Sequence, residues 1–142
     1  MCDNVLATDI VFVIDTSSSV GHDNFHKMRE FIKDIVRAFD VDNQLTRVGV
    51  VTFDETAQLL IPLSRHNSLR TLLEGIDRLR YGNGYATRTD KALMMARDQA
   101  FAEINGARPT VNKVKYYFYL LCRFIFDAWK FYLIPLLNRL LK

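Results

Sequence analysis

The sequence has few cysteines, prolines and glycines, and it has no long apolar run. Its 142 residues include two cysteines, three prolines and six glycines. Two cysteines, Cys2 and Cys122, are too few to define a disulfide framework, so we expect both to be unpaired. The apolar runs at 116–122 and 131–137 fall well short of the roughly 20 residues that a membrane span requires. We therefore expect no transmembrane anchor.

The sequence also lacks the signatures of common enzyme classes. Ser17–Ser19 do not form a nucleophile elbow, and no histidine is placed by sequence to act as their base. Residues 82–84, Gly-Asn-Gly, lack the third glycine of a dinucleotide fingerprint and follow no predicted strand. A phosphoryl-transfer enzyme of the haloacid dehalogenase type has a second acid two residues after Asp15, where this chain has Ser17. These absences predict a protein that is not an enzyme.

Charge is nearly balanced, with a formal net charge of +3. Residues 1–111 carry 13 Lys or Arg and 15 Asp or Glu, whereas residues 112–142 carry 6 and 1. Basic residues at 27–37 alternate with acidic ones, which is typical of a solvated helix face and argues against a nucleic-acid partner. His22 and His26 lack the glutamate of a zinc-protease motif, so we expect surface histidines. The basic, aromatic tail favours either a membrane surface or exposed, misfolded sequence.

Apolar spacing along the chain alternates between strand and helix periods. The expected elements are a strand at Ile10–Ile14, a helix over 23–39 with Asp23 as N-cap, strands at Arg47–Phe53 and Thr56–Leu63, helices marked by Leu69–Leu79 and Leu93–Ile104, and an apolar stretch at Val114–Leu121. The turn at Asp54–Glu55 is short enough for an antiparallel hairpin. This order predicts one layered α/β domain with a mostly parallel sheet.

Polar oxygens follow the first strand. Asp15, Ser17 and Ser19 lie between that strand and the first helix, at the sheet edge where ligands of open α/β folds bind. A glycine-rich loop, 81–87, places Thr87 at another helix entrance on the same side. Oxygen ligands of this kind suit a hard divalent cation such as Mg²⁺. The alternative is a serine-rich helix cap with no ligand.

Two segments together resemble the metal-ion-dependent adhesion site of the von Willebrand factor type A (VWA) family. They are Asp15-Thr-Ser17-Ser-Ser19 and Thr87-Arg-Thr89-Asp-Lys-Ala-Leu93. Asn24-Phe25, residues 47–53 and Ala107-Arg-Pro109 extend the likeness over about residues 8–114. The resemblance implies a Rossmann-like three-layer sandwich with Mg²⁺ or Mn²⁺ on the upper edge of the sheet.

The same resemblance implies roles for individual residues. Ser17, Ser19 and Thr87 would contact the ion directly or through water, while Asp15 would hold the waters and the serine hydroxyls. An acidic side chain of a protein ligand would complete the coordination. The resemblance further implies a secreted adhesion or extracellular-matrix protein, with a matrix protein such as collagen as a possible partner. No signal peptide is visible in this chain, so we expect its start to be internal to a longer protein.

The likeness has two departures. The family usually has glycine where this chain has Asp90, and its fourth strand ends in Thr-Asp-Gly where residues 115–122 contain no aspartate. We therefore expect a partial VWA domain over 1–114 with an incomplete, weakly binding ion site. Residues 115–142 would be a divergent tail, with a fourth strand and then a helix near 124–141, arising from an alternative or misread end of the transcript. The alternative is a truncated fragment that binds nothing.

Overall fold

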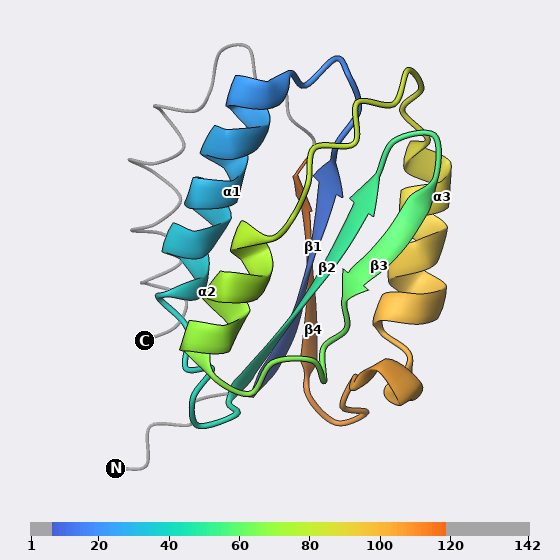
Figure 1. Cartoon of the computed structure of the whole chain (residues 1–142). Helices are drawn as coiled ribbons and strands as arrows, with labels where there is room; N and C mark the ends of the chain where they lie inside the picture. The colour runs from blue at the N-terminus through green and yellow to red at the C-terminus, as the bar shows by residue number, and fades with distance from the viewer. Residues whose placement is uncertain (1–6, 119–142) are drawn as a thin grey trace.

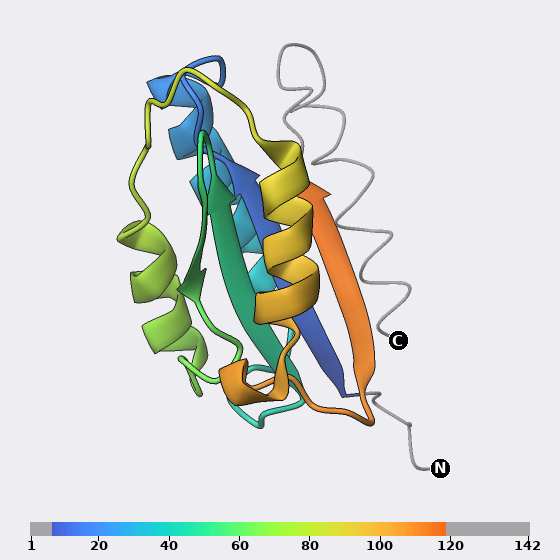
Figure 2. The same ribbon diagram turned by 90° about the vertical axis from the view of Figure 1, so that its right-hand side faces the viewer.

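The computed structural model describes residues 7–118, which form a four-stranded sheet between helices on both faces (Figures 1 and 2). In chain order the elements are β1 (Thr8–Asp15), α1 (His22–Val36), β2 (Thr46–Phe53), β3 (Ala57–Ile61), α2 (Leu69–Asp77), α3 (Thr89–Met95), a π-helical turn (Ala96–Ala100), a 3₁₀ turn (Glu103–Asn105) and β4 (Asn112–Phe118). Both cysteines and the helix expected near 124–141 lie outside the described residues.

The strand order is β3-β2-β1-β4, with β1 at the centre of the sheet. β1 pairs in parallel with both β2 and β4, whereas β3 pairs antiparallel with β2. The predicted hairpin and the mostly parallel sheet are therefore confirmed. The strand expected from Val114 begins two residues earlier, at Asn112, and pairs with β1 as far as Phe118.

Every residue of β1 is buried, because helices cover the sheet on both sides. Ile10, Phe12 and Ile14 join the core beneath α1 and α2. Val11 and Val13 face the other way and pack in the core beneath α3. This alternation explains the uninterrupted apolar run of the sequence, since both faces of a doubly covered strand must be apolar.

The start of α1 differs from the prediction. Gly21, and not Asp23, is the N-cap, and its carbonyl accepts a hydrogen bond from the Phe25 amide at 3.0 Å. Its φ of 78° lies in the region that favours glycine. Asp23 instead stands in the first turn, where its charge is favourable to the helix dipole. The helix also ends earlier than expected, at Val36.

The segment expected as one helix over Leu93–Ile104 is divided between α3, the π-helical turn and the 3₁₀ turn, and its buried face matches the expected one only in part. Leu93 is 41% exposed and Ile104 is 89% exposed, although the apolar pattern placed both in the core. Ala96 and Ala100, which belong to the same apolar pattern, are buried as expected, and Ala92 is buried with them. These small side chains let the helix lie close to the sheet, whereas Leu93 and Met94 are left exposed.

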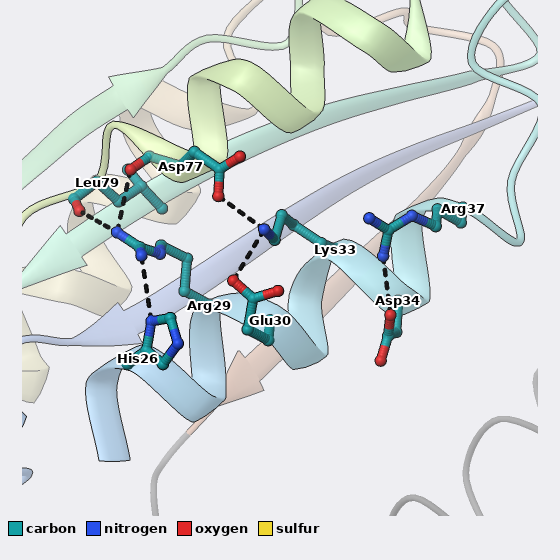
Figure 3. A network of polar contacts seen from close by, with 8 residues as sticks. All are labelled: His26, Arg29, Glu30, Lys33, Asp34, Arg37, Asp77 and Leu79. Carbon is teal, nitrogen blue, oxygen red and sulfur yellow. Dashed lines mark hydrogen bonds and ion pairs between the residues drawn. The ribbon is translucent and has the colours of Figure 1, made fainter. Parts of the chain in front are cut away.

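One basic residue of α1 is not on the solvated face that the alternating charges predicted. Lys33 is only 9% exposed, and its ammonium bridges Glu30 at 2.8 Å and Asp77 at 2.7 Å (Figure 3). This bridge joins α1 to the last residue of α2. Arg37 does fit the prediction, since it pairs with Asp34 on the surface.

Candidate metal site

Asp15 is the last residue of β1, and its carboxylate shapes the loop that follows. Its Oδ1 accepts a hydrogen bond from the Ser17 amide at 2.8 Å. Asp15 is 7% exposed and Ser17 is 1% exposed. A buried carboxylate thus lies directly beneath the first serine of the predicted site.

Three hydroxyl groups meet above this carboxylate. Ser17 Oγ and Ser19 Oγ lie 3.0 Å apart, and Thr87 Oγ1 donates a hydrogen bond to Ser17 Oγ at 3.1 Å. Ser17 is buried, whereas Ser19 and Thr87 are exposed. The cluster therefore opens to solvent on one side, as a site for an external ligand must.

The loop that carries Thr87 is joined to the β1–α1 loop by its backbone. The Ser18 amide donates to the Gly84 carbonyl at 2.7 Å, and the Asn83 amide donates to the Thr16 carbonyl at 3.0 Å. The two loops lie at the same end of the sheet in both views of the molecule (Figures 1 and 2). These bonds bring the threonine to the serines although 70 residues separate Ser17 from Thr87.

The turn between β2 and β3 supports the loop that carries Thr87. The sequence did not predict this contact. The Asp54 carbonyl accepts from the Arg88 amide at 2.8 Å, and Glu55 Oε1 accepts from the Tyr85 amide at 3.1 Å. Lys91 Nζ also donates to the Glu55 carbonyl at 3.2 Å. Asp54 and Glu55, interpreted from sequence as simple turn residues, therefore hold the threonine loop from its other side.

Asp90, the residue that stands where the family has glycine, is paired with its neighbour. Arg88 Nε donates to Asp90 Oδ1 at 2.8 Å, and the other end of the guanidinium reaches Oδ2 at 2.6 Å. The hydrogen bond from Arg88 lowers the pKa of Asp90 to about 2. Both carboxylate oxygens are therefore engaged by an arginine on the surface.

The donor set fits a hard divalent cation. It consists of Ser17 Oγ, two further hydroxyl oxygens within hydrogen-bonding distance of it, and one carboxylate beneath them, and oxygen donors are what Mg²⁺ and Mn²⁺ prefer. Within residues 7–118, no three histidine, cysteine or acidic side chains group together as a metal site. A site here depends on hydroxyl groups and needs further oxygens from water or from a ligand.

The chain matches the von Willebrand factor type A domain over residues 9–118, and it belongs to that family. It is 34% identical over 105 residues to von Willebrand factor A domain-containing protein 2 of Xenopus laevis, covering 74% of this chain and 13% of that protein. It is 35% identical over 108 residues to human matrilin-1, covering 76% of this chain and 22% of that protein. The chain thus spans a small part of the length of these relatives.

Solved structures share the fold. Proximal thread matrix protein 1 from the mussel byssus superposes with a TM-score of 0.74 at 26% identity, covering 79% of this chain and 30% of that one. Another structure of that mussel protein has a zinc-occupied MIDAS motif, where MIDAS stands for metal-ion-dependent adhesion site. That structure is 23% identical to this chain, and its TM-score of 0.70 shows a likeness of fold. The predicted family and the Rossmann-like α/β fold are confirmed.

No helix in the described part of the chain is long and apolar enough to cross a membrane.

Proposed function

We propose that this chain is a metal-ion-dependent protein-binding module that performs no catalysis. Ser17, Ser19 and Thr87 would hold Mg²⁺ or Mn²⁺, and Asp15 would keep the hydroxyls and waters in place. When bound, the ion supplies a positive centre that attracts an acidic side chain of a protein ligand. The observation that carries the proposal is the meeting of three hydroxyls from two loops above a buried carboxylate.

Two features support a metal site that needs an acidic ligand to complete the coordination of the ion. Hydroxyl oxygens carry no formal charge, so they leave most of the charge of a divalent ion uncompensated. The segment of β4 from Asn112 to Phe118 adds no acidic residue to the sheet. We propose weak intrinsic metal affinity, because loss of a supporting carboxylate at a metal site typically costs about 10- to 100-fold.

Partner and location follow from the relatives and remain part of the proposal. The chain is 32% identical over 107 residues to the mouse collagen alpha-4(VI) chain, and its structural neighbour from mussel is a thread matrix protein. We propose an extracellular-matrix setting and a matrix protein, such as a collagen, that presents an acidic side chain.

Isothermal titration with Mg²⁺ and Mn²⁺ tests the metal site. Ser17→Ala should weaken Mn²⁺ binding by about tenfold or more, because Ser17 is the hydroxyl that contacts both others. Ser18→Ala is the matched control, since Ser18 joins the loop through its backbone. Thr87→Ala and Thr89→Ala form a second pair of the same kind.

The outcomes separate the proposal from its alternative. Mn²⁺ binding that is equal in Ser17→Ala and Ser18→Ala would overturn the metal site. A cooperative thermal transition that shifts upward with Mn²⁺ in the wild type supports a binding module, because a ligand that binds only the folded state stabilises it. An uncooperative transition that metal does not shift would favour a truncated fragment without binding function.

A further inference from the structure

A groove beside the hydroxyl cluster is lined by basic and apolar side chains. It lies between the first half of α1 and the segment that follows α2, and its volume is about 360 Å³. The apolar side chains are Phe25, Leu79 and Tyr81, and the basic ones are His22, His26, Arg29 and Arg80. None of the described residues that line it is acidic, so an anionic occupant would meet no repulsion from its walls.

Arg29 is held in place by backbone carbonyls and a histidine, and no carboxylate of the described residues forms an ion pair with it. One terminal nitrogen donates to the carbonyls of Asp77 at 3.0 Å and Leu79 at 3.4 Å, and the other contacts His26 Nδ1 at 3.2 Å (Figure 3). Carbonyl groups are neutral, and the carboxylate of Asp77 is already bound by Lys33. The guanidinium is therefore ordered in advance, which reduces the entropy cost of binding an anion.

Arg80 adds a second arginine to the lining of the groove. It is exposed, and in the described part of the chain it forms no ion pair. Arg37, Arg70, Arg88 and Arg97, which also lie on the surface, each pair with an acidic neighbour. The arginines beside the groove are thus available to a ligand in a way that these four are not.

Tyr81 connects the groove to the hydroxyl cluster. Its ring packs edge-on against His22, with ring centres 6.0 Å apart, and lies 5.8 Å from the ring of Phe25. Its hydroxyl donates a hydrogen bond to the Ser18 carbonyl at 3.1 Å. Because Ser18 lies between two of the three cluster residues, one ligand segment can occupy the groove and reach the cluster.

We propose that this groove binds a second acidic side chain, next to an apolar one, from the same protein ligand that binds the metal site. The inference rests on the proposed function and names a further contact of its ligand. Two charged guanidinium groups match a carboxylate, and the apolar floor matches a neighbouring aliphatic side chain. The apolar floor favours an acidic peptide over a sulfated polysaccharide, which would leave that surface unused.

Fluorescence anisotropy with a labelled peptide, Gly-Asp-Gly-Leu-Glu-Gly, tests the groove in the presence of Mn²⁺. Arg80→Glu should weaken peptide binding by about tenfold, because it places a negative charge against the ligand carboxylate. Arg65→Glu is the control of equal charge, since Arg65 is exposed and lies in the connection before α2, outside the groove. A peptide with Gln in place of Glu should bind weakly and lose its sensitivity to Arg80→Glu.

The outcomes distinguish an acidic-peptide groove from a polysaccharide site, and the groove from the metal site. Equal loss of binding in Arg80→Glu and Arg65→Glu, with thermal transitions like that of the wild type, would overturn the groove. Binding of a heparin hexasaccharide that depends on Arg80, with no binding of the peptide, would also overturn it in favour of a polysaccharide. Peptide binding that Arg80→Glu weakens and Ser17→Ala leaves unchanged would support the groove and overturn the metal site.

Discussion

Arg108 and Asp9 lie 99 residues apart in the sequence and form an ion pair at the end of the sheet opposite the hydroxyl cluster. The Asp9 side chain is fully buried, and its two oxygens accept hydrogen bonds from the Arg108 amide at 2.7 Å and from Nε at 2.8 Å. The same guanidinium donates to the carbonyls of Thr8, Gln44 and Leu45. One side chain thus joins β1 to the segments that lead into β2 and β4.

We expect Arg108→Leu to reduce the free energy of unfolding by about 3–5 kcal/mol, because it leaves a buried carboxylate without its positively charged partner. The double variant Asp9→Leu/Arg108→Leu should lose less than Arg108→Leu alone, since it removes the unpaired charge as well. Urea unfolding of both variants measures the difference. A double variant less stable than the single one would contradict this account of the pair.

Gly84→Ala should disturb the threonine loop. An added Cβ at this position would lie 2.8 Å from both Cβ and Cγ of Asp54, closer than side chains pack. We expect a loss of about 1–3 kcal/mol in stability and weaker Mn²⁺ binding, because the loop must move away from the β2–β3 turn. Tyr85→Ala in the same loop, where the side chain is 91% exposed, should change stability little. Equal stability of the two variants would show that the close approach is unimportant.

Asp90→Asn should leave metal affinity close to that of the wild type. Arg88 already binds both oxygens of this carboxylate, and its hydrogen bond keeps the pKa of Asp90 near 2. The group is therefore ionised and paired throughout the pH range of a metal titration. Calorimetric titration with Mn²⁺ measures the effect, and an affinity change of about tenfold in either direction would show that Asp90 acts on the ion.

Stability should fall in mild acid partly through His66. Burial of the ring lowers the pKa of His66 below its usual 6.5, and repulsion from Arg65 and Arg78 adds to the effect. The unfolded chain then binds more protons than the folded one, so stability is present above about pH 6.5 and declines as the pH falls toward the folded pKa. His66→Gln should flatten this part of the profile. Unfolding measured at about pH 7.5 and about pH 5.5 compares the two proteins.

Much of the fold could be predicted because buried positions in strands and helices are occupied by apolar residues at regular spacing in the sequence. β1 is covered by helices on both faces, so its sequence is an unbroken apolar run. The polar residues that follow it mark the edge of the sheet. The predictions failed where a neighbour in space decided burial. Leu93 is exposed because the alanines beside it form the contact with the sheet, and Lys33 is buried because Asp77 lies opposite it.

Local sequence by itself determined the order of the strands and helices, the family, and the two segments that hold the candidate site residues. Only the tertiary structure decided that Ser17 meets Thr87 and that Glu55 holds the loop that carries Thr87. It also decided that Arg29 and Arg80 share a groove with Tyr81. The physical reason is the separation in sequence between the residues that make contact. Periodicity reports what each residue faces along its own element, whereas contacts between distant residues arise only when the elements pack.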